Sequence, residues 1–180
     1  MNKKSTCSTV LKCIVLNYIW KPGRSISCKA LPFNHLLSVM LDQTLTTNKI
    51  NDIRNYLDEL LPLLKKESRE IIDESLVLHT VERLFQLIVD SAIDLNTHII
   101  SQSHLAVPAD YQSTFIVLGE NKILPMEFAL EIAPSVGLRN LIVHKYGNVD
   151  MKRMVDDIKN NIGDYLQYLK LVSATVINID

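Results

Sequence analysis

The chain is poor in cysteine. Of its 180 residues only three are cysteines, and all of them, Cys7, Cys13 and Cys28, lie near the N-terminus. Their odd number and irregular spacing fit neither a disulfide framework nor a zinc knuckle. We therefore expect a protein of a reducing cytoplasm.

Long apolar runs are also missing. No run approaches the roughly 20 residues that a helix needs to span a bilayer, so we expect no membrane segment. Two N-terminal lysines precede an apolar stretch at residues 13–20 and imitate a secretory signal. Asn17 interrupts this stretch, however, and no small-x-small cleavage site follows it. Both observations favour a cytoplasmic location.

The motifs of several enzyme classes are absent. The chain has only five glycines and no Gly-rich phosphate loop, and no serine sits in a strand-to-helix nucleophile elbow. His79, His98 and His104 lack the spacing of a helical metal-binding pair. The sequence therefore argues against metal-dependent and nucleotide-cofactor enzymes, and we expect neither a metal nor a cofactor.

An excess of basic charge is missing from most of the chain. Residues 1–47 carry six Lys and Arg against one acid, a net charge of +5, whereas residues 48–180 carry thirteen against nineteen, a net charge of -6. Bulk electrostatics therefore do not favour nucleic-acid binding by the larger part. RNA binding there would require a local cationic groove and should be weak and sensitive to salt.

Apolar residues at helical spacing dominate the chain from Lys49 onward. We expect a helix from there to about residue 64, shortened or bent by Pro62, and a long helix over about 69–103. Asp110 is a candidate cap of a short helix that ends near Asn121. The expected apolar stripe of the first helix is Ile50, Ile53, Leu57, Leu60, Leu61 and Leu64, and that of the second is Val81, Leu84, Ile88, Ala92, Leu95 and Ile99.

Two further helices are expected in the C-terminal part. Pro125 is well placed to begin one that Pro134 should kink, and Asp150 is a candidate cap of the last one. The apolar face of that last helix is Met154, Ile158, Ile162, Tyr165, Leu169 and Val172. Because no segment alternates with period two for long enough to form a sheet, we predict an all-α, up-and-down antiparallel bundle of about five helices.

Residues 139–146 form the most informative segment. Arg139, His144 and Tyr146 cluster there at the end of an apolar helix. Arginine grips phosphate oxygens with a permanently charged fork of donors, histidine exchanges a proton near neutral pH, and tyrosine offers a hydroxyl. This equipment suits a phosphodiester handled without a metal.

The Arg-x4-His-x-Tyr spacing resembles the signature of the HEPN superfamily, and in particular the HepT-like toxins encoded beside a minimal nucleotidyltransferase antitoxin. The order of parts over residues 48–172 agrees with that family. The agreeing segments are Val81-Glu82-Arg83-Leu84, Ala92-Ile93-Asp94-Leu95-Asn96, Val107-Pro108-Ala109-Asp110-Tyr111 and Ala133-Pro134-Ser135-Val136-Gly137-Leu138. We accordingly divide the chain into an N-terminal extension, poorly ordered or loosely docked (residues 1–47), a HEPN domain (residues 48–172) and a C-terminal tail (residues 173–180).

The resemblance implies a homodimeric toxin ribonuclease with RNA as its substrate. Its catalytic pair would be Arg139 and His144, and its partner, the cognate nucleotidyltransferase, would silence it by adenylylating Tyr146. Chemically, His144 suits the base that removes the proton of the ribose 2′-hydroxyl, and Arg139 suits the cation that stabilises the phosphorane. Asn140 is expected to support this pair by orienting the histidine or a phosphate oxygen, since positions 140 and 144 share a helix face.

One straight helix does not direct Arg139 and His144 at one phosphate. Five residues at about 100° each place the two about 140° apart around an ideal helix, with a rise of about 7.5 Å. Unwinding of the helix at the histidine, the long reach of arginine, or a two-fold dimer would each reconcile the two positions. The resemblance implies the dimer, and an isologous interface makes it geometrically natural.

Other interpretations remain open. Arg139 can pair with an acid such as Glu131 or Asp150, and His144 can be a surface residue stabilised by the helix dipole. The polar stripe from Arg83 to Ser101 can be a solvated face, although Asp90 and Asp94 within it are candidates to orient Arg139. The residues of this stripe are Arg83, Gln86, Asp90, Asp94, Thr97 and Ser101. The rival functions are a non-catalytic HEPN module that binds nucleotide or RNA and docks a nucleotidyltransferase, and a purely structural helical dimer.

Overall fold

The computed structural model describes residues 33–144 and 150–177, and every regular element in these ranges is a helix. By its contacts the chain forms two compact units, residues 1–37 and residues 38–180. The helices are α2 (Phe33–Leu63), α3 (Ser68–Asp73), α4 (Ser75–Gln102), α5 (Ser113–Glu120), α6 (Met126–Ile132), α7 (Ser135–His144) and α8 (Met151–Ile177). The predicted all-α class is confirmed.

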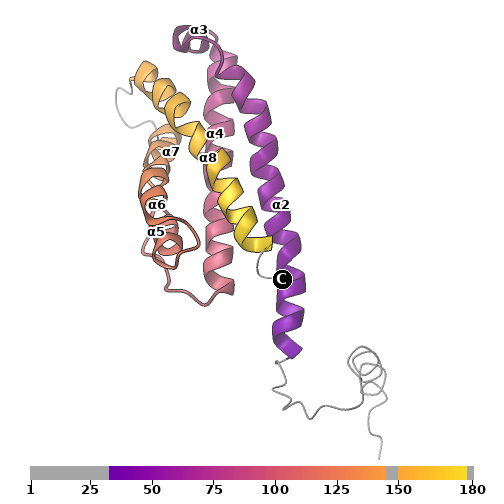
Figure 1. Cartoon of the computed structure of the whole chain (residues 1–180). Helices are drawn as coiled ribbons and strands as arrows, with labels where there is room; N and C mark the ends of the chain where they lie inside the picture. Colours follow the sequence, from indigo (N-terminus) through magenta and orange to yellow (C-terminus); the bar gives the residue numbers. More distant parts are fainter. Residues whose placement is uncertain (1–32, 145–149, 178–180) are drawn as a thin grey trace, which may run out of the picture. The chain divides into compact units, whose positions relative to one another are not determined.

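The long helices α2, α4 and α8 form the body of the bundle in residues 38–180 (Figure 1). The short helices α5 and α7 pack against α4, and α6 packs against α8. All six predicted apolar residues of α8 are buried, as are five of the six predicted for the first helix, including Leu64 directly after α2, and five of six on α4; only Leu61 and Ile99 are partly exposed. The helical periodicity therefore predicted correctly which faces build the core.

Helix α2 begins earlier than expected. It starts at Phe33 rather than near Lys49, and it ends at Leu63, one residue after Pro62. An end directly after Pro62 agrees with the expected effect of a proline, which lacks the N–H that a helix interior requires. The division of the chain at residue 47 falls inside this helix and stays a prediction.

The expected continuous helix over residues 69–103 is wrong, because the chain breaks at Glu74 between α3 and α4. Glu74 has an extended backbone (φ −95°, ψ 91°), and Lys66 Nζ lies 3.0 Å from both of its carboxylate oxygens. At the other end of α3, Ser68 Oγ donates to Asp156 on α8 at 2.5 Å, and Lys159 Nζ donates to the Lys66 carbonyl at 2.7 Å. The last two contacts join residues 88 and 93 positions apart in sequence, and the local hydrophobic pattern contains none of these contacts.

The expected helix that begins at Pro125 is divided rather than kinked. Pro125 is the N-cap of α6, as predicted, but α6 ends at Ile132 and α7 begins at Ser135. Pro134 lies between them, where its ring and missing N–H prevent continuation of the helix. The candidate catalytic residues therefore lie on a separate short helix, α7.

Asp150 caps α8 as expected, whereas the N-cap position of α5 is Gln112 and Asp110 lies two residues before it, although its carboxylate still binds a backbone N–H where α5 begins. Asp150 Oδ1 accepts the Arg153 backbone N–H at 3.0 Å at the start of α8. Asp110 Oδ1 accepts the Ser113 N–H at 2.7 Å, where α5 begins, and this hydrogen bond is the main reason that the pKa of Asp110 lies below its usual value. Each satisfies a backbone donor that a helix start leaves without an intrahelical partner.

None of the described helices combines the length and the apolar character that a membrane span requires.

Candidate functional site

Arg139 projects from α7 onto the middle of α4, where it pairs with Asp90. Its Nε atom lies 2.7 Å from Asp90 Oδ1, and its Nη2 donates a hydrogen bond to Asp90 Oδ2 at 3.0 Å. The two side chains are 24% and 38% exposed. The ion pair therefore lies at the rim of the bundle, half-buried but within reach of a ligand. Glu131 and Asp150, the acids first considered as partners, do not pair with it in the described residues.

Asn140 contacts the arginine. Arg139 Nη1 donates a hydrogen bond to Asn140 Oδ1 at 3.1 Å, and the Asn140 side chain is partly exposed. The expected role of Asn140, to orient the histidine or a phosphate oxygen, stays a prediction. The observed contact joins Asn140 to Arg139. Asn140 and Asp90 together hold the guanidinium from two sides.

The two acids considered on the polar stripe behave differently. Asp90 contacts Arg139, whereas Asp94, one turn further along α4, forms an ion pair with Lys49 of α2 at 2.7 Å. The Asp94 interaction raises the pKa of Lys49. The sequence identified the correct face of α4 but not which of its two aspartates meets α7.

His144 is the last residue of α7, and its side chain is exposed. Residues 145–149 lie outside the described ranges, so the predicted modification site Tyr146 does too. His144 is thus open to solvent at the C-terminal end of α7, five residues after Arg139.

The helix α7 includes both Arg139 and His144 without interruption. On an ideal helix the two side chains point about 140° apart, and Arg139 spends its reach on α4. Unwinding at the histidine would involve residues 145–147, which lie outside the described ranges, so it stays open together with the long reach of arginine and the dimer.

Helix α7 is firmly anchored beneath the motif. Ser135 and Tyr165 of α8 share a buried hydrogen bond of 2.7 Å between their hydroxyl oxygens, and Val136 and Ile142 are buried. Burial raises the pKa of Tyr165, so its hydroxyl stays protonated. These contacts fix the helix that carries Arg139 and His144.

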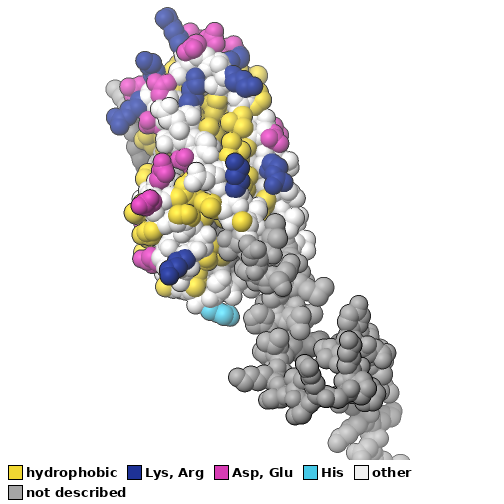
Figure 2. All heavy atoms as spheres, in the orientation of Figure 1, with side chains coloured by type: hydrophobic (Ala, Val, Ile, Leu, Met, Phe, Trp, Pro, Cys, Tyr) yellow, Lys and Arg dark blue, Asp and Glu magenta, His cyan; other side chains and the backbone are white. Residues whose placement is uncertain are grey.

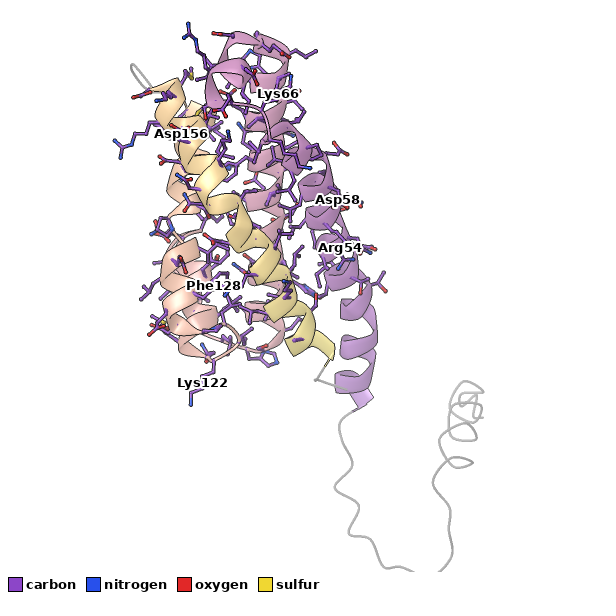
Figure 3. The ribbon with its side chains drawn as sticks, turned by 45° about the horizontal axis from the view of Figure 1, so that its top comes forward. Arg54, Asp58, Lys66, Lys122, Phe128 and Asp156 are labelled. Atoms are coloured by element: carbon purple, nitrogen blue, oxygen red, sulfur yellow. The ribbon has the colours of Figure 1, made fainter. Side chains whose placement is uncertain are left out.

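Charges of both signs are interspersed on the molecular face drawn in Figure 2, where the described side chains form no extended basic patch. This agrees with the net charge of -6 over residues 48–180. In Figure 3, Lys122 extends away from the bundle, whereas Phe128 of α6 is buried.

No metal site is apparent in the part of the chain that the structure describes, since no three His, Cys, Asp or Glu side chains gather there.

Comparisons with known proteins agree on one family. The model of the family described as "Ribonuclease HepT-like" matches residues 53–172. A tRNA nuclease HepT from Aphanizomenon flos-aquae is 32% identical over 144 residues, which cover 78% of this chain and 95% of that protein. An mRNA nuclease HepT from Shewanella oneidensis is 26% identical over 85 residues, which cover 47% and 64% of the two chains.

A solved structure shares the fold. The HEPN toxin of Shewanella oneidensis, tri-AMPylated and in complex with the MNT antitoxin, superposes with a TM-score of 0.67 at 22% identity, covering 72% of this chain and 97% of that one. The matched region contains Arg139 and His144 as well as Asp90 and the core of the bundle. The chain belongs to the ribonuclease HepT-like family of HEPN proteins.

Proposed function

We propose that this chain is the toxin of a toxin–antitoxin pair and acts as a metal-independent endoribonuclease. The observation that carries the proposal is that Asp90 holds the guanidinium of Arg139 on α7, five residues before the exposed His144. The family to which the chain belongs is one of ribonucleases. Relatives that share the fold are named as nucleases of tRNA and of mRNA. RNA is therefore the proposed substrate class.

In the proposed reaction His144 removes the proton of a ribose 2′-hydroxyl, and that oxygen attacks the adjacent phosphorus. The bond from phosphorus to the 5′-oxygen breaks, and that oxygen takes up a proton from water or from the protonated His144, which leaves a 2′,3′-cyclic phosphate and a 5′-hydroxyl. Arg139 stabilises the additional negative charge on the phosphorane oxygens as it develops. DNA lacks the attacking hydroxyl and should not be cut.

The proposed active form is a homodimer with a shared groove. The reason is the geometry of α7, because one copy directs Arg139 toward α4 and holds His144 at the helix end. A two-fold axis next to α7 would bring the arginine of one copy near the histidine of the other. Leu141 and Val143, which lie between the two motif residues and are 42% and 44% exposed, supply apolar surface for such an interface.

A mixing experiment tests this arrangement. Chains carrying Arg139→Ala and chains carrying His144→Ala should each be inactive, but a mixed dimer keeps one arginine and one histidine on opposite copies. If the site is shared, co-expression restores part of the RNA cleavage. Cleavage that stays at the level of either single variant, although mixed dimers are recovered, would contradict a shared site.

The proposed partner is a nucleotidyltransferase antitoxin that transfers AMP to Tyr146. The HEPN toxin of Shewanella oneidensis is described as tri-AMPylated and in complex with an MNT antitoxin, and Tyr146 stands two residues after His144. An adenylate there would add bulk and negative charge beside the histidine and would repel RNA phosphates. Silencing by modification follows from this charge.

One observation favours a second function, a module that binds RNA or nucleotide without cutting it. The net charge of -6 over residues 48–180 opposes strong RNA binding, and a binding module would need only the weak contact that Arg139 provides.

Induced expression in bacterial cells separates the two functions. The parent should arrest growth and fragment cellular RNA, whereas Arg139→Ala and His144→Ala should permit growth with intact RNA. Healthy growth and intact RNA in cells that accumulate the parent would exclude the ribonuclease and favour the binding module.

A further inference from the structure

We propose that Asp90 is a positioning residue of the ribonuclease site, which sets the orientation of the Arg139 guanidinium toward the scissile phosphate. This inference rests on the proposed function. It extends the site to α4, where Asp90 lies 49 residues before Arg139 in sequence. Asp90 itself does not touch the substrate in this proposal.

The contact between the two residues fixes a direction. The Asp90 carboxylate meets the guanidinium side-on, with Oδ1 at 2.7 Å from Nε and Oδ2 at 3.0 Å from Nη2. Only the Nη2 contact has hydrogen-bond geometry, since Nε is buried and makes no hydrogen bond in the described residues, but the close charge contact at Nε adds a second restraint on how the guanidinium can pivot. The neighbours Val89 and Ser91 are buried in the bundle, so the carboxylate projects from a rigid part of α4.

The occupied donors determine what remains for a phosphate. A guanidinium has five N–H groups; one on Nη2 goes to Asp90 and one on Nη1 goes to Asn140, and the Nε side faces Asp90. Within the described residues no second partner takes the other hydrogen of each terminal nitrogen. Two such hydrogens are the fork with which arginine grips a phosphate, and the Arg139 side chain is 24% exposed.

The same carboxylate opposes RNA binding through its charge. Asp90 partly neutralises the arginine and repels a nearby phosphate. Its removal should therefore leave RNA binding unchanged or stronger, while catalysis becomes slower because the guanidinium is no longer aimed at the developing charge. Slower turnover together with equal or tighter binding separates positioning from simple damage to the fold.

The chain supplies a matched control on the same helix. Asp94 lies one turn after Asp90, is exposed, and pairs with Lys49 instead of Arg139. The experiment compares the purified full-length parent with Asp90→Ala, Asp90→Asn and Asp94→Asn, and uses Arg139→Ala as the inactive reference. It measures kcat, KM, the RNA dissociation constant at two salt concentrations and the unfolding temperature, with bulk tRNA and an mRNA transcript as probes.

We expect Asp90→Ala to lower kcat by about 10- to 100-fold, the loss typical of a misplaced catalytic group, with KM unchanged or lower. Asp90→Asn keeps a hydrogen-bond acceptor of the same shape and should lose less. It also guards against a folding defect in the alanine variant. Asp94→Asn should behave like the parent in both constants.

The outcomes distinguish a failure of the positioning role of Asp90 from a failure of the proposed ribonuclease function. If the parent cuts RNA, Arg139→Ala does not, and both Asp90 variants match Asp94→Asn, the positioning role is overturned and the proposed function stands. A fall in kcat that parallels a fall in unfolding temperature and comes with weaker RNA binding also overturns it. If the parent cuts neither RNA, the proposed function fails and takes this inference with it.

Discussion

Asp90 and Arg139 join α4 to α7 through an ion pair in which Oδ1 and Nε are 2.7 Å apart. Partly exposed ion pairs contribute only about 0–1 kcal/mol to stability. The main consequence of this pair is therefore the direction of the Arg139 guanidinium, on which the proposed stabilisation of the phosphorane depends.

The pH dependence of stability should reveal Asp164. Burial, and secondarily the nearby charge of Glu131, raise the pKa of this carboxyl above its ordinary value of 3.8. The folded state thus binds the proton more tightly than the unfolded chain, so the contribution of Asp164 to stability is fully present below pH 3.8 and is lost as the pH rises through the raised pKa. Asp164→Asn should accordingly raise the unfolding temperature at pH 7.

Glu131→Gln is the control for that prediction. It removes the neighbouring charge but not the burial, so it should give a smaller gain at pH 7. For both variants the gain over the parent should shrink as the pH is lowered toward 3.8. A gain from Asp164→Asn that is the same at pH 4 and pH 7 would contradict the assigned cause.

A buried hydrogen-bond chain should be sensitive to loss of one hydroxyl. The Tyr168 hydroxyl donates to Asn96 Oδ1 at 2.7 Å, and Asn96 Nδ2 donates to Thr114 Oγ1 at 3.2 Å. Both Tyr168 and Asn96 are 0% exposed, so Tyr168→Phe leaves a buried acceptor without this donor. We expect a loss of about 1–3 kcal/mol in the free energy of unfolding by urea.

Tyr111→Phe provides the comparison, because the Tyr111 side chain is 63% exposed. It should change the free energy of unfolding by less than about 0.5 kcal/mol. Equal effects of the two substitutions would mean that the buried chain is not what stabilises the core.

Close packing of α5 against α6 should reject a methyl group at Gly119. A Cβ atom there would lie 2.8 Å from Ala129 Cβ and 2.9 Å from Met126 Sδ, and Ala129 has no rotamer by which to withdraw. Gly119→Ala should therefore destabilise the fold by about 1–3 kcal/mol. At Gly163 in α8 a Cβ meets nothing within 4 Å, so Gly163→Ala should stabilise the helix by up to about 1 kcal/mol.

Thermal unfolding of the two glycine variants checks this pair. Opposite shifts in unfolding temperature are expected. A Gly119→Ala variant as stable as the parent would show that α5 and α6 can separate without cost.

Tyr146→Phe should keep the fold and the toxicity but escape silencing. The variant lacks the hydroxyl that would accept AMP, so co-expression with a cognate nucleotidyltransferase should not rescue growth. Intact mass spectrometry provides the measurement, with the parent as the positive control. An AMP adduct that persists on Tyr146→Phe would place the modification on another residue.

The local pattern of the sequence was sufficient for the faces of the helices and for several of their ends. Met154 and Leu169 of α8 are buried as their spacing predicts, and Asp150 caps that helix. Both features depend on residues a few positions apart. The break at Glu74 was not predicted, because apolar spacing records neither the extended backbone of Glu74 nor its ion pair with Lys66.

The site was predictable in part for the same reason. The motif indicated Arg139 and His144, and the polar stripe of α4 offered Asp90 and Asp94 as partners. Only the crossing of α4 and α7 decides between the two acids, and it selects Asp90 while Asp94 meets Lys49 of α2. Helix crossings arise from the packing of whole surfaces, so the residue spacing within one helix does not reveal them.

The most direct test of the central claim is RNA cleavage by the purified chain in the presence of a metal chelator, with the ends of the products identified. The account predicts fragments with 2′,3′-cyclic phosphate and 5′-hydroxyl ends from the parent, and none from Arg139→Ala or His144→Ala. Undiminished cleavage by His144→Ala, or no cleavage by the parent of either tRNA or mRNA, would contradict it.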